Sequence, residues 1–451
     1  MLSRFKPNFV ALLTAALLCG AWACSAADEG QVAADVAETA SEGDWSLGHT
    51  FVFADDTAQN KWAIAVFHPT AGLVKTLEVP ELAERTAKKA KELQTEDTGP
   101  GWSDVVLSKD QRRIFANAEN ADALVVIDVK NMAVERVFEF EFGDRPFHSY
   151  LPNDGVEVWI HLDGKGAFFV LDSQTGVPLN GLGQLVSCTS PEVNQGHGKL
   201  LYGEGLGDKY FCTNSNEPAA FVLDAKTRAV TQKIPMCGTK PQDDPNTPED
   251  ESAGPLKGGT HDKAYLPGPH LAAIQCLGSA GYSFINPDTM AVVEEGVDIV
   301  GGIAHSPDSE YVFNVNTTKE QVQVWDASDP EVNGHGFDFT LKIGGEPSAK
   351  GTQFRQTSDH WQAWVPQTGG SDVAVVNLAT RAVTLVEIGA SAMPGGALHL
   401  TRKSALGRAA LYTHAAQRVL KIDYQTFKVT PLLGDFEGAL SQMIFVDPDA
   451  Q

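Results

Sequence analysis

The sequence predicts an all-β fold, a single closed β-propeller of four-stranded blades. From about Thr50 onward the chain repeats alternating apolar and polar residues, Gly/Asn/Asp turns and a strand that ends in aspartate or asparagine. The clearest copy, Gly301–Asn316, is followed by Gln321-Val-Gln-Val-Trp-Asp326. Equivalent strand endings occur at Val125–Asp128, Phe169–Asp172, Phe221–Asp224, Phe284–Asn286, Val375–Asn377 and Leu420–Asp423. The repeat length is that of a propeller blade with its loops.

Seven repeats are internal and start near residues 101, 145, 196, 258, 301, 351 and 395. We expect an eighth blade to be split, with three strands from residues 50–79 and the fourth from Ser441–Val446. Such closure pairs strand edges that would otherwise be exposed. The sequence therefore predicts eight blades, with seven as the alternative. A short helix is expected at Glu81–Leu93 and an acidic surface loop at Pro241–Pro255.

The N-terminal segment 1–24 has the features of a secretory signal. Arg4 and Lys6 precede an apolar run that is too short to span a membrane. Cys24 follows a small residue, as in bacterial lipoprotein signals, where this cysteine carries the lipid; cleavage without lipidation is the alternative. Residues 25–47 are small, polar and acidic and are expected to form a flexible tether to a propeller spanning 48–451. We therefore expect a protein of the periplasm or cell envelope, attached to a bacterial membrane only through its N-terminal lipid.

The charge balance limits the partners of the body of the protein. The 451 residues carry a formal net charge of −24. Nucleic acid and anionic lipid headgroups are therefore electrostatically poor partners, whereas cations are favoured.

Histidines recur where the innermost strand of each blade begins. Aligning the blades there gives Asp104, His148, His197, His261, His305, Arg355, His399 and Ser441. Only 12 of the 451 residues are histidine, yet five of them fall at these eight positions. Because innermost strands surround the propeller axis, the sequence predicts that these side chains converge on the central channel.

A cluster of neutral imidazoles beside a carboxylate suits zinc or copper. We expect His148, His197 and His261, with Asp104 or water as the fourth ligand, to bind one divalent transition-metal ion, with zinc favoured over copper. His305 and His399 would surround these ligands, serve as a transfer site or belong to a second metal site. The alternative is a polar, water-filled channel without metal. The other histidines are assigned to the surface or to packing: His49, His68, His161, His270, His335, His360 and His414.

The four cysteines after the signal predict two disulfides, as expected of an exported chain. Cys188 and Cys237 each precede a cysteine of the following blade, Cys212 and Cys276. We therefore expect Cys188 to pair with Cys212 and Cys237 with Cys276. Thiolate ligation of the metal is the competing interpretation.

The repeat style resembles the YVTN family of bacterial propellers, with Ser306-Pro-Asp308 as its cleanest motif, and this resemblance implies the fold alone. Residues 145–278 also resemble periplasmic zinc metallochaperone propellers that serve ABC-type zinc importers. The shared features are Arg145-Pro-Phe-His148, Asp154-Gly155, Asp163-Gly-Lys-Gly166, Gly196-His197-Gly198 and His261 between Cys237 and Cys276. The resemblance implies zinc binding by His148, His197, His261 and Asp104, and a metal-transport protein as partner. A histidine-rich N-terminal segment and a paired His-His at the third of these blades, which that family has, are absent from this sequence.

Two other functional classes compete with metal binding. A non-catalytic interaction platform fits the fold but leaves the histidines unexplained. A copper- or haem-dependent oxidoreductase would need an electron-entry site, and the sequence has neither a Cys-x-x-Cys-His haem motif nor a copper-thiolate cluster. The sequence therefore favours a binding protein over an enzyme.

Overall fold

The computed structural model describes residues 47–447, apart from 57–59, 97–98, 182–183, 204, 238–257, 278–280, 298–301, 308, 328–337, 390–397, 402–406, 415–417 and 434–438. The expected signal with Cys24, nearly all of the expected tether and the expected loop Pro241–Pro255 lie outside the described residues.

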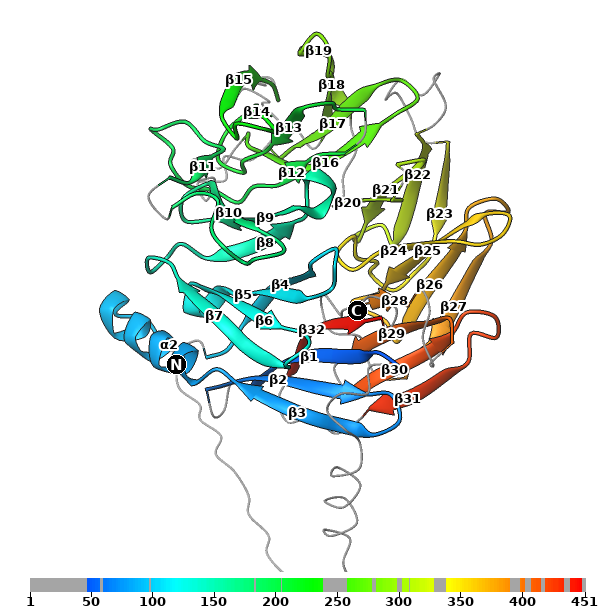
Figure 1. Ribbon diagram of the computed structural model, residues 1–451. Helices are drawn as coiled ribbons and strands as arrows, with labels where there is room; N and C mark the ends of the chain where they lie inside the picture. The colour runs from blue at the N-terminus through cyan, green and yellow to red at the C-terminus, as the bar shows by residue number, and fades with distance from the viewer. Residues whose placement is uncertain are drawn as a thin grey trace, which may run out of the picture. The chain divides into compact units, whose positions relative to one another are not determined.

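Eight sheets, each of four antiparallel strands, are arranged as blades around one axis, which confirms the eight-bladed all-β propeller (Figure 1). From the innermost strand outward, blade 1 contains β32 (Ala439–Val446), β1 (His49–Asp56), β2 (Lys61–His68) and β3 (Gly72–Glu78). Blades 2 to 4 contain, in the same order, β4 (Trp102–Leu107), β5 (Arg113–Ala118), β6 (Ala123–Asp128) and β7 (Ala133–Glu139); β8 (Pro146–Tyr150), β9 (Glu157–Leu162), β10 (Ala167–Asp172) and β11 (Val186–Ser187); and β12 (Leu200–Leu201), β13 (Lys209–Cys212), β14 (Ala219–Asp224) and β15 (Val230–Pro235). Blades 5 and 6 contain β16 (Thr260–Leu266), β17 (Leu271–Cys276), β18 (Gly281–Asn286) and β19 (Ala291–Val297); and β20 (Gly302–His305), β21 (Tyr311–Asn316), β22 (Gln321–Asp326) and β23 (Phe339–Lys342). Blades 7 and 8 contain β24 (Gln353–Gln356), β25 (Trp361–Pro366), β26 (Asp372–Asn377) and β27 (Val383–Glu387); and β28 (Leu398–Leu400), β29 (Ala409–His414), β30 (Arg418–Asp423) and β31 (Val429–Leu433).

The last strand closes the first blade, as the sequence predicts. β32 pairs antiparallel with β1 from His49 opposite Val446 to Asp55 opposite Ala439. In Figure 1 the two ends of the chain's colour scale, blue β1 and red β32, lie side by side. The innermost strands of neighbouring blades also contact one another, as in the pairs β32 and β4, β4 and β8, and β12 and β16. These strands therefore surround the axis.

The aspartate that ends the third strand of a blade shapes the turn that follows. Oδ1 of Asp172 accepts hydrogen bonds from the backbone N–H groups of Gln174 and Thr175, at 3.1 and 2.7 Å. Asp224 and Asp423 form the same turn in blades 4 and 8. Because an Asx side chain mimics a turn of the backbone, it ends the strand and reverses the chain. The recurring strand ending in the sequence is thus a local turn signal.

Apolar side chains fill the space between neighbouring blades. One cluster joins Trp159 and Phe168 of blade 3 to Tyr210 and Phe221 of blade 4. Trp159 is fully buried, and its ring lies 5.6 Å from that of Tyr210 in an edge-to-face contact. Packing of this kind holds the blades at fixed angles, so that side chains from different blades meet at the axis.

Helix α2 (Pro80–Leu93) lies where the sequence predicts a helix and begins one residue earlier. Pro80 suits the first turn because its missing N–H would have no helical partner there. Nε of Arg85 donates to the carbonyl of Ala121 in η1 (Glu119–Ala121), which ties the helix to blade 2. A second 3-10 turn, η2, spans Asn153–Gly155. Among the described residues, no helix has the length and apolar character needed to cross a membrane.

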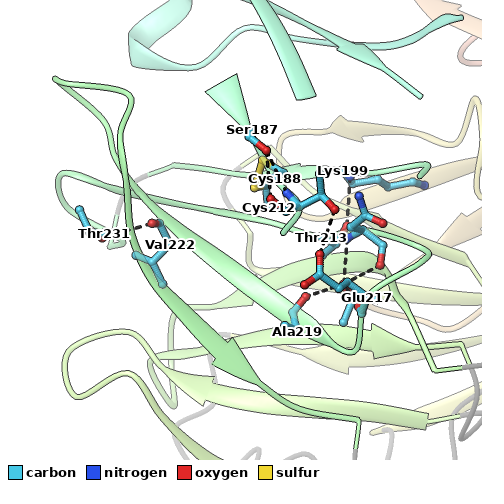
Figure 2. The surroundings of a disulfide bond; sticks show 12 residues. Ser187, Cys188, Lys199, Cys212, Thr213, Glu217, Ala219, Val222 and Thr231 are labelled. Carbon is cyan, nitrogen blue, oxygen red and sulfur yellow. Dashed lines mark hydrogen bonds between the residues drawn. A yellow bond between two sulfur atoms is a disulfide. The ribbon is translucent and has the colours of Figure 1, made fainter. Parts of the chain in front are cut away.

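Two disulfides join Cys188 to Cys212 and Cys237 to Cys276, the pairs expected from the sequence. The first attaches the segment entering blade 4 to the second strand of that blade. The hydroxyl oxygen of Thr213, the residue after Cys212, accepts a hydrogen bond from the backbone N–H of Lys199 at 3.0 Å. Figure 2 shows Lys199 and Thr213 beside this disulfide. The covalent link thus stiffens the chain next to the channel.

Candidate metal centre

The strand ladders define which residues of different blades lie at the same height along the channel. In blades 2 to 6 the third strand ends in Asp or Asn. The residue three positions before this end pairs with a residue of the second strand, and these second-strand residues lie at one common level along the channel. On the innermost strands this level falls at Val105, Ser149, Leu200, Lys263 and Ile303. The residues immediately before it are Asp104, His148, Lys199, Asp262 and Gly302. Asp104 and His148 are therefore equivalent, whereas His197 and His261 precede the equivalent position by two residues and one.

Three of the predicted ligands nevertheless come together. Nε2 of His148 lies 3.1 Å from Nε2 of His197, and the two ring centroids are 4.7 Å apart. The ring of His261 stacks on that of His197, with centroids 5.0 Å apart. The exposed fractions of the three side chains are 18, 22 and 26%, so an ion can reach them from the channel. We call His148, His197 and His261 the histidine cluster.

Asp163 orients the middle member of the histidine cluster. Its Oδ2 accepts a hydrogen bond from Nδ1 of His197 at 2.9 Å, and its Oδ1 accepts one from Nδ1 of His161 at the same distance. Burial opposes ionisation of Asp163, but the two hydrogen bonds hold its pKa well below the usual range. Because an ionised carboxylate only accepts, His197 carries its proton on Nδ1. A neutral His197 therefore presents a lone pair on Nε2, toward His148.

Asp104, the predicted acidic ligand, lies beside His148. Its Oδ2 is 3.9 Å from Nδ1 of His148 and accepts a hydrogen bond from the backbone N–H of Ser149 at 3.0 Å. Asp262 makes the same contact between blades 5 and 6, where its Oδ2 accepts from the N–H of Ile303 at 3.0 Å. Burial raises the pKa of Asp104, although backbone hydrogen bonds from Ser149 and Val105 and the positive charges of Lys350 and Lys199 partly offset this effect.

Lysines also enter the channel next to the histidine cluster. Nζ of Lys199 donates a hydrogen bond to Oδ1 of Asp262. Nζ of Lys263 lies 5.7 Å from the centre of the Tyr150 ring. Burial lowers the pKa of Lys263 to about 8, and the charge of Lys199 adds to this. The channel therefore combines carboxylates, imidazoles and ammonium groups.

The same surroundings keep the imidazoles neutral. Burial lowers the pKa of His148 well below its usual value, and the positive charge of Lys199 adds to the effect. Burial and Lys199 also lower the pKa of His261 to about 4. Neutral imidazole is the form that binds metal. His148 and His261 can therefore bind an ion at neutral pH without first losing the extra proton of an imidazolium ring.

The remaining axial residues make contacts elsewhere. His305 lies three residues beyond Gly302, which places it roughly 10 Å further along the channel. Its Nδ1 donates to the carbonyl of Ser306 at 3.0 Å, and burial together with Lys263 lowers its pKa to about 4. The ring of His399 lies 6.2 Å from that of Phe445. Nη1 of Arg355 donates to Gln362 at 3.0 Å, and its guanidinium lies over the ring of Tyr424.

The histidine cluster fits a zinc ion in its chemistry and in the spacing of two donors. Nitrogens about 2.0–2.1 Å from a tetrahedral zinc lie roughly 3.3 Å apart, close to the 3.1 Å between the Nε2 atoms of His148 and His197. Within the described part of the chain, no three His, Cys, Asp or Glu side chains are already arranged as a complete metal-binding set. Side-chain rotation of His261 or Asp104 would have to complete the coordination.

Comparison with known proteins identifies structures that are similar in fold. Neither a protein-family model nor a curated protein sequence matches the chain. The dihydro-heme d1 dehydrogenase NirN in complex with DHE has a TM-score of 0.59 at 13% identity, covering 91% of this chain and 77% of that one. Apo AztD from Citrobacter koseri has a TM-score of 0.56 at 12% identity, covering 89% of this chain and 98% of that one. The Dos1 propeller has a TM-score of 0.51 at 13% identity, covering 88% and 96%. At these identities the similarity shows the β-propeller fold alone, and the YVTN resemblance stays a prediction.

Two residues of the centre are missing from the predicted set. His161, which the sequence pattern assigns to the surface or to packing, is fully buried and shares Asp163 with His197. Its Nε2 lies against Gly198, where an added Cβ would stand 2.7 Å from that nitrogen. The glycine next to His197 is therefore needed for close approach. The Asp163-Gly-Lys-Gly166 turn is the sequence signal that could have pointed to Asp163.

Proposed function

We propose that this protein is an exported zinc-binding β-propeller that holds one zinc ion in its channel for delivery or sequestration. His148, His197 and His261 would supply nitrogens, and Asp104 or water the fourth ligand. The observation that carries the proposal is the pair of facing Nε2 atoms of His148 and His197, 3.1 Å apart, with Asp163 holding the tautomer of His197. With the His197 proton on Nδ1, Nε2 of His148 donates the hydrogen bond to Nε2 of His197, and transfer of the His148 proton to Nδ1 would leave both Nε2 lone pairs directed at one ion.

The donor set favours zinc over copper. Three imidazoles and a carboxylate are ligands that zinc prefers, whereas Cu(I) prefers thiolate and thioether sulfur. All four cysteines after the signal are held in disulfides, so thiolate ligation has no support. The positive charge of an ion bound by neutral imidazoles would also be partly offset by the negative charge of the ionised Asp163 behind them.

The setting is consistent with an exported protein. Disulfides form and persist in oxidising compartments such as the bacterial periplasm. Lipid attachment at Cys24 and a metal-transport protein as the recipient of zinc belong to the same proposal. They rest on the sequence features and on the resemblance of residues 145–278 to zinc metallochaperone propellers. The fold similarity to AztD agrees with that resemblance.

A direct zinc titration tests the proposal. Chelator-treated wild type should bind about one equivalent of zinc. A His148→Ala, His197→Ala double variant should lose at least a factor of 100 in affinity, because it removes both facing nitrogens. A His270→Ala, His360→Ala double variant is the matched control, since these histidines contact Tyr265 and Asn377 away from the cluster. Equal affinity in wild type and the first variant would refute zinc binding at this site.

The platform alternative would give a different result. An interaction protein with a polar channel should bind no transition metal tightly, and inductively coupled plasma analysis of protein purified without chelators or metal-affinity resin should find none. The purified protein could instead contain less than one zinc per chain. If the His270→Ala, His360→Ala control then loses as much zinc as the His148→Ala, His197→Ala variant, the zinc is bound by the surface histidines.

A further inference from the structure

A strap between blades 6 and 7, residues 345–352, reaches across the channel beside the histidine cluster. Its base is fixed by hydrogen bonds: the carbonyl of Pro347 accepts from the Thr317 hydroxyl at 2.8 Å, and the N–H of Ser348 donates to the Pro366 carbonyl at 2.9 Å. Ala349 packs against blade 6, where a Cβ added to Gly302 would lie 2.8 Å from its own Cβ. Gly302 is at the level of Asp104 and His148, so the strap reaches the height of the proposed metal site.

The tip of the strap contacts the opposite side of the ring. Nζ of Lys350 donates a hydrogen bond to the carbonyl of Ser103, in blade 2, at 3.2 Å. It also lies 5.9 Å from the centre of the Phe147 ring, in blade 3. Phe147 in turn contacts the rings of His148 and His197, each with centroids 4.9 Å apart. One lysine of the strap thus rests on residues that adjoin or contact three predicted ligands, Asp104, His148 and His197.

The charge of Lys350 acts on the same carboxylate that the proposed zinc ion would use. Ser103 directly precedes Asp104, and the positive charge of Lys350 stabilises the ionised form of Asp104. A divalent cation bound by His148 and His197, with Asp104 as a further ligand, would be repelled by an ammonium group close to this carboxylate. Ammonium and metal ion therefore compete for one negative charge.

We infer that Lys350 is a built-in competing cation: its ammonium occupies the electrostatic position of the metal in the empty protein and is displaced when zinc binds. This inference rests on the proposed function. Because every binding event must displace Lys350, the strap weakens zinc binding and speeds zinc release. A site weakened in this way suits delivery to a recipient rather than permanent storage.

The test compares zinc affinity in three variants. Lys350→Met keeps the length of the side chain but removes its charge, and it should bind zinc at least tenfold tighter than wild type, with slower loss to a chelator. Lys350→Arg keeps the charge and should resemble wild type. Lys342→Met is the matched control, because Lys342 is an exposed lysine at the end of β23. Raising the salt concentration should narrow the difference between Lys350→Met and wild type.

A second measurement uses the wild-type chain and does not depend on folding of a variant. The amine of Lys350 should react with an acylating reagent at least threefold faster with zinc than without, because zinc releases it from Ser103; Lys342 serves as the internal reference. Zinc binding by wild type, with no gain in affinity in folded Lys350→Met, would overturn the inference and leave the proposed function intact. If Lys350→Met does not fold, unchanged labelling of Lys350 overturns it. Failure of wild type to bind zinc would overturn both.

Discussion

The carboxylate of Asp163 accepts a hydrogen bond from Nδ1 of His197 over 2.9 Å. The two residues belong to neighbouring blades, so one contact joins blade 3 to the segment that enters blade 4. It sets which nitrogen of His197 carries the proton and aims the other at His148. The arrangement that we assign to zinc binding therefore depends on a residue that does not itself face the ion.

Replacing Asp163 with asparagine should weaken zinc binding by about 10- to 100-fold. The amide no longer fixes the proton of His197 on Nδ1, although its size is nearly unchanged. Competition against a chelator of known affinity measures the effect. Asp154→Asn is the matched control, since that side chain is 85% exposed and pairs only with Lys109 among its described contacts. Affinity within twofold of wild type in Asp163→Asn would show that the tautomer does not matter.

Zinc binding at pH 6 should release few protons. Three histidines with an ordinary pKa near 6.5 would together release about two protons at this pH, since each would be mostly protonated. His148 and His261 have lowered pKa values, about 4 for His261, so they are neutral at pH 6 and release none. We expect about one proton or fewer. Calorimetric titration in buffers of different ionisation enthalpy gives the number, and a value of two or more would contradict the neutral cluster.

The low pKa of His261 should also make the metal-free fold sensitive to acid. The unfolded chain binds a proton on this residue below about pH 6.5, whereas the folded chain does so only near pH 4. Stability from this group is thus fully present above pH 6.5 and is lost as the pH falls toward 4. Asp55 acts in the opposite direction, because burial raises its pKa to about 7.

A comparison with His261→Gln isolates the contribution of this one group. Between pH 7 and 4.5, wild type should lose about 2 kcal/mol more unfolding free energy than the variant, which cannot be protonated there. Urea unfolding at both pH values measures the difference. An equal loss in the two proteins would mean that His261 titrates normally.

Removing either disulfide should destabilise the propeller by about 3–4 kcal/mol, since the closed loops span 24 and 39 residues. Cys188→Ala, Cys212→Ala and Cys237→Ala, Cys276→Ala can be compared with wild type by urea unfolding under oxidising conditions. Non-reducing peptide mapping should recover the two pairs without cross-linked peptides joining Cys212 to Cys276. A stability change below 1 kcal/mol in both double variants would argue that the loops are held by packing alone.

The features predicted correctly from the sequence are those with local signals. The Asx turns after Asp172 and Asp224 mark the ends of third strands within a few residues, so the blades can be counted from the sequence. The closing strand is recognisable because residues 50–79 supply only three strands of the first blade, and the alternating apolar residues of Ser441–Val446 supply the missing fourth strand. Pairing of the cysteines follows from their places on successive repeats.

The height of each side chain along the channel could not be predicted in the same way. The innermost strands β4, β8 and β16 each shift register within a few residues, between Trp102 and Val105, Pro146 and Ser149, and Thr260 and Lys263. A bulge adds a residue to one strand only, and no repeat pattern in the sequence shows where it falls. Aligning histidine with histidine therefore conceals the lysine and aspartate, Lys199 and Asp262, that occupy the level of His148.

The pairing of β1 with β32 has a consequence for how the protein reaches its folded state. Synthesis proceeds from the N-terminus, so β1 is made almost four hundred residues before the strand that pairs with its inner edge. Until then blade 1 presents an open edge to which a strand of another molecule could add. Contacts between such distant parts of a chain form slowly. A cell producing this protein must therefore protect one early strand for most of the time of synthesis, which makes chaperones that cover open strand edges a condition of its yield.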